Sequence, residues 1–393
     1  MRMVPREELY NRIGKLQKSM QKKEIAGALI IQRADLFYFS GTGQNAHLYV
    51  PADGEPVLIV KKSLVRAEQE SAIENIIPFR GWNELIALIA DMTPKGSKVG
   101  LETDVLPFNL YNRYQKMLDE FSITDISPFI RAIRALKSKY ELNTMREAAG
   151  ISEAVFTHAR EIIHEGLSEI ELAGRLELKA RTLGHQGAVR MRGFNQELYF
   201  GHIMTGENAA TVSFFDGPTG GSGLNPSYPQ GAGKAVIKPN EPILIDFVSV
   251  LDGYMVDQTR LFCIGGLKPH LQEAYNQAVK IRNALATEGK PGILGSTLYT
   301  RADELATGAG LANHFMGYTE RVNFVGHGVG IELDELPVIA RGLDILLEEG
   351  MVFALEPKFI FPGEGTVGIE DTFVVGCDGL ELLTRFSEGL QVI

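Results

Sequence analysis

The chain of 393 residues has few cysteines, no long basic run and no long apolar run. Its two cysteines, Cys263 and Cys377, stand within apolar segments, which predicts a buried free thiol for each rather than a structural disulfide. No basic run is longer than the pairs Lys22-Lys23 and Lys61-Lys62, and the formal net charge is -10. Nucleic acid is therefore excluded as the main partner, because a phosphate-binding face needs clustered Lys and Arg.

Membrane and export signals are also missing from the sequence. No window approaches the roughly 20 apolar residues that a membrane span requires. The first residues, MRMVPREELYNRI, are charged and amphipathic and lack the apolar core of a signal peptide. We therefore expect a cytoplasmic protein with no membrane partner.

The composition of the chain is typical of globular proteins, with 45% hydrophobic and 22% charged residues. Its length suits two domains. Residues 1–135 predict a small α/β domain without a catalytic constellation. Its first helix, over Glu7–Lys23, gathers an apolar stripe on one face: Leu9, Ile13, Leu16 and Met20. Apolar runs that predict strands follow, with a turn at Asp53-Gly54 and a helix after Pro107: Gly27–Ile31, Leu36–Phe39, His47–Val50, Pro56–Val60 and Lys98–Leu101.

A second domain, residues 136–393, begins with two predicted helices, at about Ser138–His164 and Ser168–Leu183. Ser168 and Glu171 predict a capping box at the start of the second helix. Three histidines on or beside these helices are predicted to be packed or surface residues and not ligands: His158, His164 and His185. Strands then dominate, interrupted by a Gly- and Pro-rich loop over Asp216–Gly233, whose unusual length predicts a place near the active site.

Two acidic residues face the same way on a predicted hairpin. Pro242–Val250 turns through Asp252-Gly253 and returns as Tyr254–Ile264. A two-residue loop places Asp257 opposite Val248, so Asp246 and Asp257 become diagonal neighbours on one face, with Cβ atoms about 7 Å apart. Because a buried carboxylate without a partner costs several kcal/mol, two on one apolar face predict a bound cation.

A second predicted hairpin repeats this arrangement with glutamates. Met351–Phe361 turns through Pro362-Gly-Glu-Gly365 and returns as Thr366–Val375, which brings Glu356 and Glu370 nearly opposite one another. Between the hairpins, the glycines of Gly326-His327-Gly328 allow close backbone approach and leave one imidazole projecting.

Four carboxylates and one histidine are the ligands expected for two divalent ions about 3.5–4 Å apart. The predicted metal ligands are Asp246, Asp257, His327, Glu356 and Glu370. Oxygen-rich donors with one nitrogen favour Mn²⁺, with Fe, Co or Zn as alternatives.

These motifs resemble those of the pita-bread metallohydrolases, which include prolidase, aminopeptidase P, methionine aminopeptidase and creatinase. The matching segments are Ile245–Arg260, Gly326–Pro337, Gly350–Pro357 and Val367–Val375. The resemblance implies an α/β chain, with a creatinase/prolidase-like N-terminal domain followed by a pita-bread domain of duplicated α+β units. Methionine aminopeptidases lack that N-terminal domain and are disfavoured. In the family pattern the five predicted metal ligands all match, and the resemblance also implies a homodimer.

The chain departs from the peptidase pattern at two positions. Family peptidases carry a histidine shortly after an Asn-Ala-Ala element, where this sequence has Ser213, and a second histidine where it has Asp334. In the family these histidines are thought to bind the substrate carbonyl and the tetrahedral intermediate, and losing one such donor costs about 10²–10³ in rate. Ser213 can still donate a hydrogen bond, whereas an ionised Asp334 only accepts one and could hold a substrate ammonium. His202 and His314 are the candidates to replace the lost donors.

The leading hypothesis is a hydrolase that cleaves a small Xaa-Pro peptide or similar amide, as a dipeptidase or an aminopeptidase. A hydroxide bridged by two metals would attack the carbonyl, with Glu356 as the proton shuttle. Arg260 and Arg341 are candidate anchors for a substrate anion. The alternatives are action on a non-peptide C–N bond, as in ectoine-type hydrolases, a lyase reaction, and a non-catalytic binding protein.

Overall fold

The computed structural model describes residues 2–393 and contains two compact units, residues 2–134 and Ala135–Ile393. The predicted boundary at residues 135/136 lies one residue from this division. No helix among the described residues is long and apolar enough to cross a membrane.

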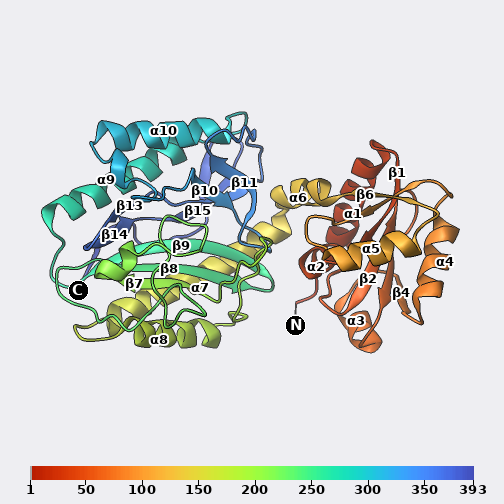
Figure 1. Ribbon diagram of the computed structural model, residues 1–393, viewed down its shortest axis with the longest axis horizontal. Coiled ribbons are helices and arrows are strands. Elements are labelled where there is room, and N and C mark those ends of the chain that lie inside the picture. The colour runs from red at the N-terminus through yellow and green to blue at the C-terminus, as the bar shows by residue number, and fades with distance from the viewer. Residues whose placement is uncertain (1) are drawn as a thin grey trace. The chain divides into compact units, whose positions relative to one another are not determined.

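The N-terminal unit is one mixed sheet with helices on its faces (Figure 1). The sheet has the order β4-β3-β2-β1-β5-β6. Its strands are β1 (Ile25–Ile30), β2 (Ala46–Pro51), β3 (Val57–Val60), β4 (Asn75–Pro78), β5 (Lys98–Leu101) and β6 (Ser122–Asp125). Its helices are α1 (Arg6–Gln21), α2 (Arg33–Ser40), α3 (Leu64–Glu70), α4 (Trp82–Met92), α5 (Phe108–Met117) and α6 (Ser127–Ala135).

Most predicted elements of this unit are present, and one is wrong. All four stripe residues of α1 are buried, as the period predicts. The run Leu36–Phe39, predicted as a strand, lies in helix α2 instead. A four-residue apolar run does not distinguish strand from helix, and the caps decide here: the Gln32 side chain accepts a hydrogen bond from Asp35 N, and Gly41 ends the helix with a φ of 77°.

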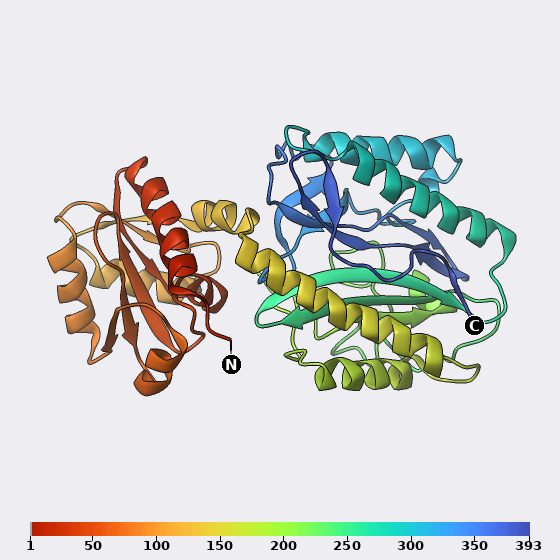
Figure 2. The same cartoon turned by 180° about the vertical axis from the view of Figure 1, so that it is seen from behind.

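The C-terminal unit begins with α7 (Lys139–Ile162) and α8 (Glu169–Thr182), close to the predicted ranges. Ser138 and Glu141 form a complete capping box on α7, whereas Ser168 accepts from Glu171 N without the reciprocal bond. Figure 2 shows α7 crossing the face of the sheet with order β17-β9-β8-β7. The strands of this sheet are β7 (Gly201–Thr205), β8 (Ile243–Leu251), β9 (Tyr254–Cys263) and β17 (Gln391–Val392).

The β8–β9 hairpin has the predicted register, because Val248 pairs with Asp257 and Asp246 pairs with Thr259. Asp252 and Gly253 both have positive φ values, 47° and 88°, as a two-residue turn of this kind requires. Asp246 and Asp257 therefore lie on one face of the sheet.

A second sheet has the order β11-β10-β12-β15-β16, and β13 and β14 form a separate ribbon. The strands are β10 (Phe324–Gly328), β11 (Glu335–Ala340), β12 (Val352–Leu355), β13 (Lys358–Phe361), β14 (Gly365–Gly368), β15 (Asp371–Val375) and β16 (Leu380–Leu382). The pairs Leu355–Asp371 and Lys358–Gly368 share one register, so Glu356 and Glu370 lie nearly opposite one another where the two ladders separate.

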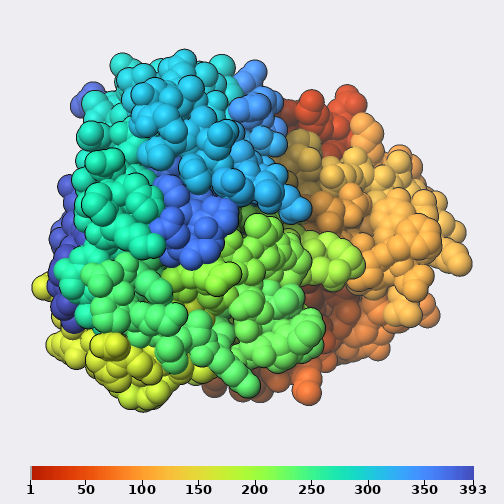
Figure 3. Space-filling view, turned by 60° about the vertical axis from the view of Figure 1, so that its left-hand side comes forward, coloured from red at the N-terminus to blue at the C-terminus, as the bar shows by residue number. Residues whose placement is uncertain are grey.

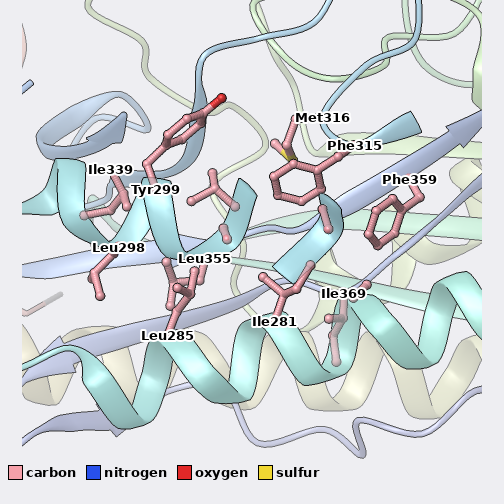
Figure 4. Packing of buried hydrophobic residues seen from close by; sticks show 14 of the residues in the cluster. Ile281, Leu285, Leu298, Tyr299, Phe315, Met316, Ile339, Leu355, Phe359 and Ile369 are labelled. Atoms are coloured by element: carbon pink, nitrogen blue, oxygen red, sulfur yellow. The ribbon is translucent and has the colours of Figure 1, made fainter. Parts of the chain in front are cut away.

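Helices α9 (Pro269–Glu288) and α10 (Gly295–Gly308) cover this second sheet and ribbon. The core between them is apolar and closely packed (Figure 4). Ile281 and Leu285 of α9 and Leu298 of α10 are at most 1% exposed and belong to one cluster with Leu355 and Ile369. The residues next to Glu356 and Glu370 are thus fixed by the core, which holds the two glutamates in place.

Two features of the described chain bear on the sequence predictions. Both cysteines are free, but only Cys263 is buried; Cys377 is exposed, because it follows β15 in a turn rather than continuing the strand. The segment Asp216–Gly233 contains no helix or strand, as predicted for a loop.

Candidate metal centre

His327 is presented by a segment in which the neighbouring backbone comes very close. A Cβ on Gly326 would lie 2.3 Å from Ala354 O, and one on Gly328 would lie 2.4 Å from Leu336 O, so both positions require glycine. The imidazole donates from Nδ1 to Leu333 O at 2.9 Å. This bond fixes the ring and leaves Nε2 as the atom that can bind a metal.

Nε2 of His327 faces three carboxylates. It lies 3.9 Å from Asp257 Oδ2, 3.7 Å from Glu356 Oε1 and 3.7 Å from Glu370 Oε1. Two ligand atoms that each lie roughly 2.1 Å from a shared ion can be at most about 4.2 Å apart. The observed separations are therefore compatible with a single ion between these groups, and Asp257, His327 and Glu370 together form a cluster able to hold one.

Two carboxylate oxygens of this cluster have no hydrogen-bond partner in the described part of the chain. Asp257 Oδ1 and Glu370 Oε1 are buried without a hydrogen-bond partner among residues 2–393. Burial, together with Glu370 and Asp246, raises the pKa of Asp257 well above its usual range. Burial alone would lower the pKa of His327, but the carboxylates of Glu370, Glu356 and Asp257 raise it to about 10. A divalent cation would relieve both conditions, so these residues fit a metal ion.

The other oxygens of the centre are occupied by a lysine that was not part of the predicted site. The Lys358 ammonium is 2.9 Å from Asp246 Oδ2, 2.8 Å from Glu356 Oε2 and 3.1 Å from Glu370 Oε2. Its side chain is 2% exposed. Burial alone would lower the pKa of Lys358, but the three carboxylates raise it well above its usual range, so the group is a fixed positive charge.

The sequence already contained a signal for Lys358. It stands two residues after Glu356, and alternate residues of an extended chain face the same way, so a lysine at this position points into the same space as the glutamate. The prediction of two metal ions took only the acidic residues and the histidine into account. A second ion held by Asp246 and Glu370 does not fit while Lys358 occupies those oxygens.

Glu370 is held from behind by a buried network that includes Arg260. Thr259 Oγ1 donates to Glu370 Oε2 at 2.7 Å, and Arg260 donates to Glu370 O at 2.8 Å and to Asp371 Oδ1 at 2.7 Å. Arg260 is 1% exposed and does not line the cavity described below. The geometry gives it a positioning role behind the ligands, and its role as a substrate anchor stays a prediction.

The metal centre forms the floor of a cavity of about 230 Å³. His202 and Asp334 lie on its wall. His202 pairs with Asp246 across the β7–β8 ladder, and its burial lowers its pKa, an effect that Asp246 partly offsets. Asp334 accepts hydrogen bonds from Arg192 N at 2.8 Å and Gly193 N at 3.0 Å, which ties the segment around residue 192 to the cavity.

Part of the long loop also lines this cavity, namely residues 216–219. Figure 3 shows the green segments from this part of the chain at the surface of the C-terminal unit. The loop thus contributes a wall to the cavity through its first residues, while residues 224–227 are exposed.

Three more predicted site residues, besides Arg260, lie outside the cavity lining. Ser213 donates to Pro229 O, so its hydroxyl is used within the loop. His314 contacts Ile360 O through Nδ1 at 2.7 Å and stacks on the Phe361 ring. Arg341 is exposed and lies 3.8 Å from Asp303. None of these placements supplies the donor that a missing histidine would have provided.

The three histidines predicted to be packed or surface residues have ordinary surroundings. His158 pairs with Glu161 on the surface of α7, and His164 contacts Glu165 O. His185 is buried and contacts Val248 O at 2.9 Å. None of them lines the cavity.

Comparison with known proteins gives two family matches that cover most of the chain. Residues 12–136 match the creatinase/prolidase N-terminal domain, and residues 143–376 match metallopeptidase family M24. A Xaa-Pro dipeptidase of Lactobacillus delbrueckii subsp. lactis is 26% identical over 97% of this chain and 98% of its own length. A Xaa-Pro dipeptidase of Pyrococcus furiosus is 25% identical over 96% of this chain and 98% of its own length.

Solved structures show the same fold. A Xaa-Pro dipeptidase from Bacillus anthracis superposes with a TM-score of 0.83 at 24% identity, covering 98% of this chain and all of that one. An X-Pro aminopeptidase from Thermotoga maritima superposes with a TM-score of 0.81 at 23% identity, covering 97% and 99%. The pita-bread architecture and its N-terminal companion domain are therefore confirmed. With the M24 match spanning more than half of its length, the chain belongs to metallopeptidase family M24.

Proposed function

We propose that this protein is a metal-dependent peptidase that hydrolyses small Xaa-Pro peptides, with Xaa-Pro dipeptides as its preferred substrates. The observation that carries the proposal is the convergence of Asp257, His327, Glu356 and Glu370 on the floor of a cavity. Membership of family M24 and similarity to proteins named Xaa-Pro dipeptidase support the reaction class.

The side chains around the centre can share the work of peptide hydrolysis. Asp257, His327 and Glu370 would hold a divalent ion, which would supply a Lewis acid for the substrate carbonyl and lower the pKa of water. Burial raises the pKa of Glu356, which suits a carboxylate that takes a proton and passes it to the leaving amine. His202 is the candidate donor to the substrate, and Asp334 the candidate acceptor for its ammonium group.

The donor set favours Mn²⁺ as the ion, because carboxylate oxygens outnumber the single imidazole nitrogen. Fe, Co and Zn are the alternatives.

The size of the cavity favours a dipeptide over a longer chain. Its volume of about 230 Å³ is below the roughly 300–1,000 Å³ of sites for drug-sized ligands. Residues 216–219 add a wall that would restrict an extended peptide. We therefore expect activity to fall when a residue is added after the proline.

The test is hydrolysis of matched Xaa-Pro dipeptides and Xaa-Pro tripeptides by Mn²⁺-loaded protein, with Asp257→Asn as the metal-site control. The proposal would be supported if the wild-type protein released proline from the dipeptides and the Asp257→Asn variant did not. Equal rates of hydrolysis of dipeptides and tripeptides would contradict the assignment as a dipeptidase and favour an aminopeptidase. No hydrolysis of either, with metal still bound, would contradict a peptidase.

That last outcome would favour the second candidate, cleavage of a non-peptide C–N bond. Ser213 is turned into its own loop, and Asp334 is an acceptor, so neither replaces a lost histidine donor. A cyclic amidine has no amide carbonyl that needs a hydrogen-bond donor, so such a substrate would suit this cavity. The same metal-loaded protein and Asp257→Asn control apply to a panel of these compounds.

We also propose that the protein is a cytoplasmic homodimer. The dimer rests on the family resemblance, and the location is the default expectation from the sequence. Light scattering of the purified protein should give about twice the chain mass of 43.2 kDa. A mass of a single chain at micromolar concentration would contradict the dimer.

A further inference from the structure

The charges of the metal centre are arranged in two halves that share their glutamates. Glu356 gives Oε2 to Lys358 and turns Oε1 toward His327. Glu370 does the same, with Oε2 at Lys358 and Oε1 near His327. Each glutamate thus bridges the ammonium on one side and the histidine cluster on the other.

Asp246 and Asp257 each belong to one half. Asp246 Oδ2 lies 2.9 Å from the Lys358 ammonium, whereas Asp257 Oδ2 lies 3.9 Å from His327 Nε2. The buried oxygens without a hydrogen-bond partner among residues 2–393, Asp257 Oδ1 and Glu370 Oε1, both belong to residues that face His327. The centre therefore has one cation in place and room for one more.

We infer that Lys358 takes the place of one of the two metal ions, and that the protein binds a single divalent ion between Asp257, His327, Glu356 and Glu370. A metal ion that used Asp246 and the same oxygen of Glu370 would have to lie roughly 2.1 Å from them, inside the cage that the ammonium fills. The lysine amine and a metal cannot both occupy this cage.

The β13–β14 ribbon holds the lysine in position. Lys358 pairs with Gly368 in this ladder, and a Cβ on Gly368 would lie 2.6 Å from Lys358 Cγ, so the glycine makes room for the lysine stem. The side chain is 2% exposed and cannot extend into solvent without disrupting this packing. The ammonium is a built-in part of the centre.

The inference rests on the proposed metal centre but not on the proposed peptide substrate. The test is the number of ions bound per chain, measured by elemental analysis after loading with Mn²⁺ alone and removing the excess. Wild-type protein should hold one ion. Lys358→Ala, which removes both the charge and the side chain from the cage, should hold two.

A matched control is Lys268→Met, which removes another lysine that pairs with a carboxylate, Glu364 at 2.7 Å, but at an exposed position. It should still hold one ion. Asp257→Asn should hold fewer than one, because it removes a ligand from the remaining site. Anomalous diffraction from wild-type crystals loaded with Mn²⁺ should give one peak beside His327, a result that does not depend on the folding of any variant.

Two ions in the wild-type protein would overturn the inference and leave the proposed peptidase intact. If wild type and folded Lys358→Ala both bound one ion per chain, the inference would also be overturned, because the lysine would then not determine how many ions are bound. No ion in the wild type would overturn both this inference and the metal-dependent function. One ion without any hydrolysis of Xaa-Pro peptides would support the inference while contradicting the peptide substrate.

Discussion

Each domain contains a cluster of buried carboxylates, and the two clusters are neutralised by different means. In the N-terminal domain, Asp35 and Glu102 are fully buried, and Arg134 pairs with Asp35 at 2.6 Å. Burial and the neighbouring Asp35 raise the pKa of Glu102 well above its usual range, which favours its protonated form. The metal centre instead gathers four carboxylates around Lys358 and His327 and leaves oxygens without partners among residues 2–393.

The comparison shows that buried acid alone does not mark an active site. In the N-terminal pair, Arg134 contacts Asp35 and burial favours the protonated form of Glu102, and neither acid lines the cavity at the candidate metal centre. Both clusters contain buried oxygens without a hydrogen-bond partner among residues 2–393: Glu102 Oε1 in the first, and Asp257 Oδ1 and Glu370 Oε1 in the second. The difference is the cavity that only the C-terminal cluster faces, and this cavity indicates a role in catalysis.

The largest expected effect is on activity, from Glu370→Gln. This change removes the charge that faces His327 and also contacts Lys358, so the ion and its catalysis should be lost. We expect the rate of hydrolysis to fall by more than about 10³-fold, since both water activation and stabilisation of the oxyanion depend on the ion. Steady-state kinetics and elemental analysis would measure this, and a variant that kept its metal and its rate would contradict the assignment.

In the other cluster, Arg134→Met should destabilise the protein without affecting metal content. The change leaves Asp35 buried without its arginine, which costs about 3–5 kcal/mol for a pair of this kind. Arg66→Met is the matched control, because it removes an exposed arginine that pairs with Glu70 in the same domain and should cost less than about 1 kcal/mol. Denaturant titration of both variants checks the difference, and equal losses would show that burial does not matter here.

Removing the metal should destabilise the C-terminal domain only. An ion present at 100 times its dissociation constant adds about 2.7 kcal/mol, which corresponds to roughly 5–10 °C in the melting temperature of a domain of this size. Chelation should therefore increase hydrogen exchange around β10 and β15 while leaving β1 and β5 unchanged. Uniform changes over both domains would contradict a local effect.

The smallest expected effect concerns pH and Glu102. Because the folded-state pKa of Glu102 is raised, its contribution to stability is fully present below its unfolded pKa of about 4.3 and is lost as pH rises through the higher folded value. The free energy of unfolding of wild type should therefore fall with rising pH over this window. Glu102→Gln should reduce that slope, whereas Glu84→Gln, at an exposed position on α4, should not. Denaturant titration of wild type and both variants at several pH values would measure these slopes, and equal slopes in all three proteins would contradict the role of Glu102.

Much of the metal centre could be predicted because tight turns fix strand register. The Asp252-Gly253 turn determines that Asp257 pairs with Val248, and the Pro362–Gly365 turn similarly sets Glu356 against Glu370. Such pairings depend only on loop length and alternation, which a sequence contains. For the same reason the position of Lys358 could have been predicted from its spacing to Glu356.

Other parts of the molecule could not be predicted from hydrophobic spacing. Leu36–Phe39 is apolar enough for either a strand or a helix, and the local cap at Gln32, which the hydrophobic pattern does not report, decides the outcome. The wall formed by residues 216–219 comes from a loop without periodicity. Ser213 aligns with a functional position, yet its hydroxyl is bound to Pro229 O. The last two placements follow from tertiary packing, so spacing alone could not provide them.

The strands that hold the centre also determine when it can form during folding. Lys358 and Asp246 are 112 positions apart in the chain, and Thr259 and Glu370 are 111 apart. Contacts between such distant segments form late, because closing the intervening loops costs entropy before any interaction compensates. An ion would therefore find its ligands only in a nearly complete C-terminal domain. We expect it to slow unfolding of the finished domain and to leave the folding rate nearly unchanged.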